Sequence, residues 1–213
     1  MSKPLIVLSD KEPFSHGRYR WCFVHPDEPS RCVKVNDPHF QPELVRKQAP
    51  FWKRLRSGES FDHNKREFRF YREYERFYGE VIWRHVPRCY GMVQTDLGPG
   101  LVVDFVGDPD GNPGQRLSEL LRKGRDSKLD RAITEFREFV LRHRLLTHEL
   151  RLQNLLFGCI SSDATQRIYI IDAIGLSDWI PLAYYSEWLA AVRVKGKIRR
   201  FDTRVDNLKQ ALQ

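Results

Sequence analysis

The apolar positions in the first third of the chain follow the pattern of short β-strands. Residues 5–8, 21–24 and 31–35 are runs rich in Val, Ile, Leu, Phe and Trp, a composition that favours strands. The second and third runs are separated by residues 25–30, whose prolines and acidic side chains suit a turn. We therefore expect a hairpin that carries Lys34 near the end of its second strand.

The pattern then changes to a helical period over residues 64–78. On this predicted helix Glu67 shares one face with Tyr71, Tyr74 and Tyr78, at the spacing i, i+4, i+7 and i+11. A carboxylate on an aromatic face needs a cation beside it, because an unpaired charge is costly to bury. Glu67 is therefore expected to pair with a basic side chain.

Two more strands are predicted at residues 87–93 and 101–106, joined by a turn at 95–100 that contains Gly and Pro. With the first hairpin they form a small, mostly antiparallel sheet that has one helix against it. Residues 107–114 are rich in Gly, Pro and Asp, which predicts a hinge.

The chain becomes mainly helical after the predicted hinge. A short helix is expected at residues 117–123 and a longer one at 127–146, where Ser127 and Asp130 predict a capping box. Further along we expect strands at 155–157 and 167–171, an amphipathic helix from 181 to 192, and then the basic run 195–200. The sequence thus predicts an α+β protein with a sheet-based part over residues 1–106, a hinge at 107–114 and a helical part over 115–213.

Candidate chemistry in the helical part lies beside its two short strands. Asn154 precedes one strand and Asp172 follows the other, so two oxygen ligands could converge on one cation at a sheet end. Glu149 lies five residues before Asn154. This order resembles the protein-kinase pattern of an acid, an amide five residues later, and a metal-binding acid that opens a D-F-G tripeptide. The corresponding segment here is a D-x-x-G, Asp172-Ala173-Ile174-Gly175.

The sheet-based part supplies the matching residues of that pattern. Lys34 resembles the strand lysine of kinases that contacts nucleotide phosphates, and Glu67 resembles its helix partner. Gly17 would lie in the turn over the phosphates, although that turn keeps one glycine where typical kinases keep three. The resemblance implies a bilobed, protein-kinase-like fold with a small antiparallel-sheet N-lobe and a truncated, mainly helical C-lobe.

Each of these residues also has a structural interpretation. Lys34 could be a solvated strand residue and Glu67 could reach solvent from the helix edge. Asn154 could cap its loop, Asp172 could close a turn, and Glu149 could be structural instead of acting as a general base. His148 occupies the place of the usual kinase arginine.

Composition limits the possible function classes. Lys and Arg number 36 against 28 Asp and Glu, a net charge of +8, which attracts polyanions whatever the fold. No apolar run approaches the roughly 20 residues of a membrane helix, and the first residues do not have the layout of a secretory signal. We therefore expect no membrane span and a cytoplasmic location. The four cysteines form no C-x-x-C pair, so a structural zinc site is not expected.

Over residues 9–188 the chain resembles the YrbL family, bacterial proteins linked to the PhoP regulatory network. The phrases that carry the resemblance are Gly17-Arg18, His25-Pro26, Arg31-Cys32-Val33-Lys34-Val35, Arg66-Glu67, Val86-Pro87-Arg88, Val93-Gln94-Thr95-Asp96, Asp108-Pro109-Asp110-Gly111 and Leu152-Gln153-Asn154-Leu155-Leu156. The family implies a kinase-like fold and no settled reaction.

Three functions follow from this resemblance and from the charge. The first is an ATP-dependent phosphotransferase with Mg²⁺ on Asn154 and Asp172 and nucleotide contacts from Gly17, Lys34 and Glu67. Its catalytic residues would be Lys34, Asp172 and Glu149, with Glu149 as the general base for the acceptor hydroxyl. No Ala-Pro-Glu motif follows Asp172, so a small-molecule, sugar or lipid hydroxyl is a better acceptor than a protein. The second is a nucleotide-binding pseudokinase that acts as a regulatory module. The third is a basic regulator that binds nucleic acid. Its support includes the mixture of Arg with Phe and Tyr over residues 65–76, although aromatic residues at helical spacing usually belong to a core.

Overall fold

The computed structural model describes residues 5–17, 19–37, 62–160, 163–172 and 182–210. The chain divides into two compact units, one of residues 1–72 and 88–105 and one of residues 73–87 and 106–213. The predicted hinge at 107–114 lies within the second unit, where Gly107 pairs with Pro113 and Cys159. The α+β class is confirmed, because the first unit holds an antiparallel sheet and the second holds several helices.

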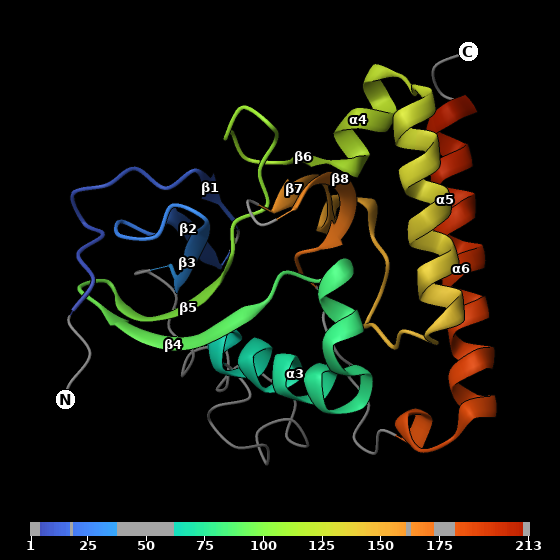
Figure 1. Ribbon diagram of the computed structural model, residues 1–213, viewed down its shortest axis with the longest axis horizontal. Coiled ribbons are helices and arrows are strands. Elements are labelled where there is room, and N and C mark those ends of the chain that lie inside the picture. The colour runs from blue at the N-terminus through green and yellow to red at the C-terminus, as the bar shows by residue number, and fades with distance from the viewer. Residues whose placement is uncertain (1–4, 18, 38–61, 161–162, 173–181, 211–213) are drawn as a thin grey trace. The chain divides into compact units, whose positions relative to one another are not determined.

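The first unit is built on one antiparallel sheet of five strands in the order β1-β2-β3-β5-β4 (Figure 1). The strands are β1 (Ser15–His16), β2 (Arg20–Val24), β3 (Arg31–Asn36), β4 (Cys89–Thr95) and β5 (Gly98–Asp104). The predicted hairpin is confirmed, with Cys22 opposite Lys34. Lys34 is in turn opposite Leu101 of β5, so β3 is a central strand.

The second predicted pair of strands is displaced along the chain. The turn predicted at residues 95–100 is present but shorter, because Thr95 pairs with Gly98 and Val93 with Gly100, which leaves a turn of two residues. Gly98 has φ of 101°, a left-handed conformation that suits glycine. A Cβ on Gly100 would lie 2.7 Å from Val33 Cγ1. These glycines therefore serve strand pairing and close packing. Composition alone does not distinguish such glycines from glycines in a turn.

The strand predicted at residues 5–8 does not form. Ile6 makes an isolated parallel bridge to Thr95, and the backbone N–H of Leu8 donates to Asp96 Oδ1 at 2.8 Å. The side chains still alternate as in a strand, since Ile6 and Leu8 are buried while Leu5 and Val7 are exposed. Ile6 and Leu8 belong to the apolar core of the first unit, whose buried residues are Ile6, Leu8, Phe23, Val33, Val35 and Val102. Residues 5–8 thus attach to the sheet through the single bridge of Ile6 and do not form a strand of their own.

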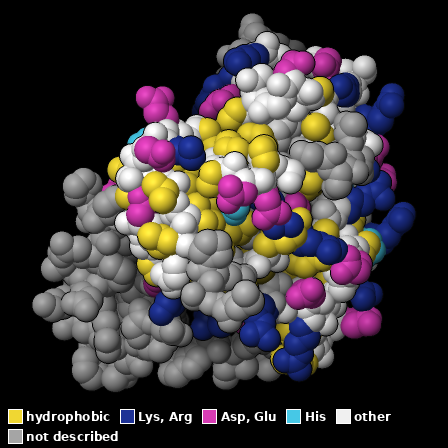
Figure 2. Space-filling model, turned by 60° about the vertical axis from the view of Figure 1, so that its left-hand side comes forward, with side chains coloured by type: hydrophobic (Ala, Val, Ile, Leu, Met, Phe, Trp, Pro, Cys, Tyr) yellow, Lys and Arg dark blue, Asp and Glu magenta, His cyan; other side chains and the backbone are white. Residues whose placement is uncertain are grey.

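Figure 2 shows one face of the molecule, on which Lys and Arg side chains lie interspersed with Asp and Glu and with exposed apolar side chains. The net charge of +8 is therefore not concentrated as one patch on this face. Among the described residues, no helix is both long enough and apolar enough to cross a membrane.

The helix α3 (His63–Tyr78) confirms the helix predicted at 64–78. Glu67, Tyr71 and Tyr74 are all buried, so the stripe found in the sequence is the inward face. The two halves of α3 fall in different units, with Glu67 in the first and Tyr74 in the second.

The second unit combines helices with a three-stranded antiparallel sheet in the order β6-β7-β8. Its elements are η2 (Gly79–Arg84), β6 (Gln115–Arg116), α4 (Leu117–Lys123), α5 (Ser127–Arg142), η3 (Leu152–Asn154), β7 (Leu155–Ile160), β8 (Asp163–Ile170), η4 (Leu182–Tyr184) and α6 (Glu187–Gln210). The helix α6 packs against both α4 and α5, and Figure 1 shows α5 and α6 side by side.

Both ends of α5 differ from the prediction. The N-cap is Asp126, whose side chain accepts a hydrogen bond from Leu129 N at 2.7 Å, so the capping box at Ser127 is wrong. The helix ends at Arg142 instead of 146, and Arg144 has a positive φ of 48°. A left-handed residue terminates an α-helix, and residues 143–146 therefore lead out of α5 toward Glu149.

The other boundaries in this unit also shift. The β7–β8 pairing continues to Ile160 and Asp163, so most of the loop expected at 158–166 is strand. The last helix begins at Glu187 instead of 181 and continues through the basic run 195–200 as far as Gln210. Residues such as Val194, Ile198 and Phe201 are buried, which explains why this basic segment belongs to a packed helix.

Candidate functional site

A buried ion pair joins β3 to α3 in the first unit. Lys34 Nζ donates to Glu67 Oε1 at 2.8 Å, and the two residues are only 6% and 7% exposed. Lys34 points to the face of β3 opposite Val33 and Val35, which belong to the apolar core. The predicted pairing of Glu67 with Lys34 is therefore present, and the solvated interpretation of Lys34 is wrong.

Glu67 has a second cationic partner that the sequence did not predict. Arg20, the first residue of β2, forms an ion pair with Glu67 Oε2. Burial by itself raises the pKa of Glu67, but the charges of Arg20 and Lys34 and their hydrogen bonds outweigh burial and lower this pKa to about 2. Two cations face one carboxylate, so the cluster of Arg20, Lys34 and Glu67 keeps a net positive charge.

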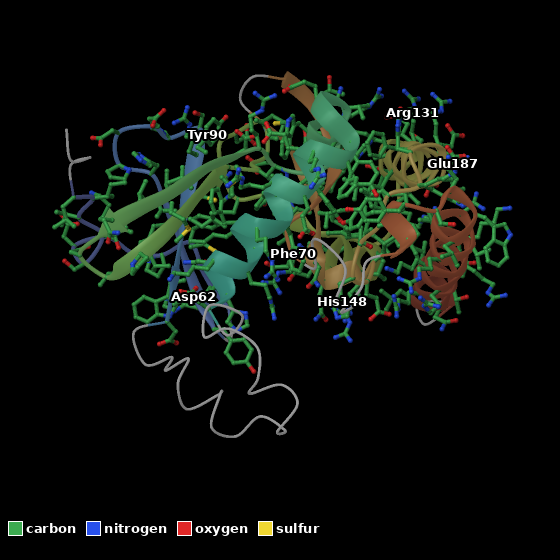
Figure 3. The ribbon with its side chains drawn as sticks, turned by 90° about the horizontal axis from the view of Figure 1, so that it is seen from below. Asp62, Phe70, Tyr90, Arg131, His148 and Glu187 are labelled. Carbon is green, nitrogen blue, oxygen red and sulfur yellow. The ribbon has the colours of Figure 1, made fainter. Side chains whose placement is uncertain are left out.

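Asn64 attaches the start of α3 to the sheet. Its Nδ2 donates to the carbonyl oxygens of Lys34 at 2.9 Å and Pro99 at 3.2 Å. Asp62 stabilises the same end of the helix, since its Oδ1 accepts from Asn64 N and Lys65 N (Figure 3). Asn64 is fully buried, and it holds Glu67, one turn further along the helix, at the level of Lys34.

Gly17 lies in the turn between β1 and β2, as predicted. Its backbone N–H donates to the carbonyl oxygen of Arg20 at 2.8 Å, and the residue is exposed. A Cβ at this position would lie 3.2 Å from the same oxygen, so the tight turn favours glycine. Its contact with phosphate remains a prediction.

Asn154 and Asp172 lie at the same end of the β7–β8 hairpin. Leu155 pairs with Ile170, and Ile171 N donates to the carbonyl oxygen of Asn154 at 3.1 Å. Asp172 is the next residue along the chain, so the predicted proximity of the two backbones is present. An amide and a carboxylate supply the oxygen ligands that Mg²⁺ prefers. The rest of the D-x-x-G motif, residues 173–175, lies outside the described residues.

Glu149 is held by two arginines. Arg204 of α6 forms an ion pair with Glu149 Oε1, and Arg151 Nε donates to Oε2 at 3.1 Å. These hydrogen bonds, from Arg204 first and then from Arg151, lower the pKa of Glu149 to about 2. A carboxylate with so low a proton affinity is a weak general base at neutral pH. No local pattern in the sequence indicates Arg204, which lies 55 residues away.

The segment that leads to Glu149 is attached to the second half of α3. Tyr74 Oη donates to the carbonyl oxygen of Leu146 at 2.5 Å, and Leu146 N donates to Tyr78 Oη at 2.9 Å. Burial raises the pKa of Tyr78 to about 12, so the phenol stays protonated. His148 follows this anchored segment and is exposed (Figure 3).

Within the described residues no group of three or more His, Cys, Asp or Glu side chains is placed to hold a metal ion. Asn154 and Asp172 are the residues at the hairpin end that could hold a metal ion. Such a site suits Mg²⁺, which usually keeps several waters and substrate phosphates among its ligands.

The solved structures that resemble this chain include the following two. A co-crystal structure of WbdD with the kinase inhibitor LY294002 has a TM-score of 0.43 at 15% identity, covering 88% of this chain and 46% of that one. The PknI kinase domain of Mycobacterium tuberculosis has a TM-score of 0.37 at 16% identity, covering 78% of this chain and 58% of that one. This chain thus matches about half the length of each solved chain.

Comparison at the level of sequence gives a family. The protein YrbL of Escherichia coli (strain K12) is 29% identical over 202 residues, which cover 92% of this chain and 86% of that protein. YrbL of Shigella flexneri gives the same values. The sequence profile described as PhoP regulatory network protein YrbL matches residues 6–206. The chain therefore belongs to the YrbL family of PhoP regulatory network proteins.

Proposed function

We propose that this protein is a kinase-like phosphotransferase that binds ATP with Mg²⁺ and phosphorylates a hydroxyl group of a small molecule, a sugar or a lipid head group. The observation that carries the proposal is the buried pair of Lys34 and Glu67. In protein kinases a strand lysine paired with a helix glutamate must be in place for activity. Here Lys34 lies on β3 and Glu67 lies on α3, the next helix among the described residues.

Phosphoryl transfer needs mainly positioning and charge neutralisation. In this proposal Lys34 contacts the phosphates, while Glu67 fixes the ammonium and Gly17 keeps the β1–β2 turn small. Arg20 adds a second positive charge to the same cluster. The net positive charge of the cluster would attract a triphosphate even though Glu67 is ionised.

Asn154 and Asp172 are the proposed ligands of Mg²⁺ in the second unit. Both are placed by the backbone of one hairpin end, so their positions depend on strand pairing and not on a free loop. When bound, Mg²⁺ neutralises charge on the phosphate oxygens. A small acceptor is favoured because no Ala-Pro-Glu motif follows Asp172 in the sequence.

The contacts of Glu149 favour a second candidate function, a nucleotide-binding pseudokinase. Glu149 occupies the place of the kinase catalytic acid, but its carboxylate is held by Arg204 and Arg151. In a pseudokinase these ion pairs would fix the loop, and the bound nucleotide would act through shape instead of turnover. Both functions use the same proposed nucleotide-binding residues, and they differ only in whether a phosphoryl group is transferred.

Thermal unfolding with and without ATP and Mg²⁺ tests the shared part of the proposal. We expect the nucleotide to raise the melting temperature of the wild type and of the control Lys65→Ala, whose side chain is exposed on α3. The rise should be lost in Lys34→Met and in Asp172→Asn. An equal response of all four proteins would overturn nucleotide binding at these residues.

Transfer itself is tested with radiolabelled ATP and separate small-molecule and lipid extracts. Label that appears on an extract component with the wild type but not with Asp172→Asn would support the phosphotransferase. Binding of ATP with no labelled product in either extract would favour the pseudokinase. Label that appears equally with both proteins would come from a contaminant and would remove the enzymatic proposal.

A further inference from the structure

The outer face of α6 carries an exposed row of side chains that the proposed function does not use. Trp188, Val192, Lys195 and Arg199 follow at i, i+4, i+7 and i+11, a spacing that places them on one stripe of a helix. All four are exposed, Trp188 by 73% and Val192 by 52%. We call these four residues the α6 stripe.

The opposite face of α6 is the one that packs against the protein. Its buried residues are Ala190, Val194, Ile198, Phe201 and Val205, and the helix contacts α4 and α5. Because the opposite face of α6 makes these packing contacts, the α6 stripe is not needed for packing of the second unit. An exposed Trp with an exposed Val one turn later marks an interaction surface and not a packing requirement.

The charge of this segment has one sign. Between Trp188 and Phe201 the sequence contains no Asp or Glu, and its basic residues are Arg193, Lys195, Lys197, Arg199 and Arg200. Tyr185, three residues before Trp188 in the sequence, is also 70% exposed. Glu187 and Asp202 flank this segment, so the aromatic side chains lie toward its start and the cations lie between residues 193 and 200.

We propose that the α6 stripe binds the surface of an anionic lipid bilayer. Trp and Tyr side chains favour the level of the lipid head groups, where an apolar ring and a polar N–H or O–H are both satisfied. Lysine and arginine beside them are attracted to anionic head groups. Trp188 and Val192 would enter the interface while Lys195 and Arg199 contact the lipid phosphates.

The arrangement favours a lipid surface over nucleic acid. Binding of single-stranded nucleic acid uses aromatic rings placed among the cations, so that bases stack while phosphates are neutralised. Here the aromatic residues precede the cations, and the exposed aliphatic Val192 lies between the two groups. This surface works without a nucleotide, so the proposal is independent of the proposed phosphotransferase activity.

Vesicle flotation of the full chain in the absence of nucleotide tests the proposal. The two probes are vesicles of phosphatidylcholine alone and vesicles of equal parts phosphatidylcholine and phosphatidylglycerol. We expect binding to the second kind only, with a loss as salt is raised. The double variant Lys195→Glu/Arg199→Glu should bind at least about 25-fold more weakly, since each lost cation near an anionic surface weakens binding roughly fivefold. Trp188→Ala should also weaken binding, and Trp188→Phe should restore part of it.

The matched control is Lys65→Glu/Arg69→Glu, which reverses two exposed cations at the same i, i+4 spacing on α3. Circular dichroism would verify that each variant is folded. Binding of the control should equal that of the wild type. An equal loss in both double variants would overturn the α6 stripe as the site, because net charge alone would then explain binding. Absence of wild-type binding to anionic vesicles would also overturn it. So would a result in which Lys195→Glu/Arg199→Glu binds anionic vesicles like the wild type and loses only its binding to a single-stranded RNA oligomer.

Discussion

The guanidinium of Arg204 forms an ion pair with the carboxylate of Glu149 and donates to the carbonyl oxygen of Leu150 at 3.1 Å. One side chain of α6 thus fixes both the acid and the backbone of the loop that carries it. Arg204 thereby makes the largest contribution to the lowered pKa of Glu149.

Replacing Arg204 by Ala should raise the pKa of Glu149 from about 2 toward its ordinary value of 4.5. The rise should be incomplete, because Arg151 still donates to the same carboxylate. Carbon NMR of labelled glutamate side chains across a pH titration would measure it. Arg199→Ala, an exposed arginine of the same helix, is the control. A titration of Glu149 that is identical in wild type and Arg204→Ala would contradict the assigned cause.

The Glu67 cluster should make folding sensitive to acid. Because the pKa of Glu67 is lowered in the folded state, its stabilisation is present above the ordinary pKa of 4.5 and is lost as pH falls toward about 2. Glu67→Gln should lower the free energy of unfolding at neutral pH by about 3 kcal/mol, since the buried Lys34 and the partly buried Arg20 lose their carboxylate. It should also remove this part of the acid dependence.

Denaturant unfolding at a series of pH values would measure both effects of Glu67→Gln. The control is Glu75→Gln, at an exposed position on the same helix, which should leave the curve nearly unchanged. If Glu67→Gln and Glu75→Gln behaved alike, the buried cluster would not be the origin of the acid sensitivity.

Asn64 should tolerate loss of its side chain better than conversion to a carboxylate. Asn64→Ala removes two hydrogen bonds to carbonyl oxygens and should cost about 1–3 kcal/mol. Asn64→Asp would bring a buried negative charge against the same two oxygens, so it should be less stable than Asn64→Ala at neutral pH. The difference in stability between the two variants should become smaller or reverse at acidic pH, where the protonated Asp side chain can donate one hydrogen bond. Chemical denaturation at two pH values measures the order, and an Asp variant as stable as wild type at neutral pH would refute it.

Replacing Gly158 or Gly196 by alanine should change the free energy of unfolding in opposite directions. A Cβ on Gly158 would lie 2.5 Å from the carbonyl oxygen of Gly107, so Gly158→Ala should cost about 1–3 kcal/mol through backbone displacement. Gly196 lies within α6, and the nearest atom to its added Cβ is 3.8 Å away. Gly196→Ala should stabilise by about 0.5–1 kcal/mol, because alanine loses less backbone entropy in a helix. Thermal unfolding of both variants checks the pair, and shifts of the same sign would contradict it.

The features that the sequence predicted well depend on neighbours along the chain. The hairpin that holds Lys34 and the helix that holds Glu67 follow from periodicity, and burial of Tyr71 and Tyr74 confirms the predicted inward face. The ends of strands were less predictable where a residue type such as glycine occurs both in turns and in strands. The glycines from 98 to 100 extend a strand, although their composition is typical of a turn.

The features that the sequence did not predict depend on partners far along the chain. Arg20 is 47 residues from Glu67, and Arg204 is 55 residues from Glu149. With 36 Lys and Arg side chains available, no local pattern identifies which cation meets which carboxylate. Asn64 was missed for a different reason: a single amide at the start of a helix is typical of a capping residue, yet here it is buried and binds the sheet.

The hydrogen bonds of Tyr74 and Tyr78 to the segment before Glu149 limit how α3 can change its length. Glu67 and these tyrosines lie on one continuous helix, so inserting or deleting one residue between them would rotate one end against the other by about 100°. Either Glu67 would leave the buried pair with Lys34, or the tyrosines would leave Leu146. A substitution at an exposed position of this stretch, such as Arg69 or Arg72, keeps both sets of contacts, whereas a change in the number of residues does not.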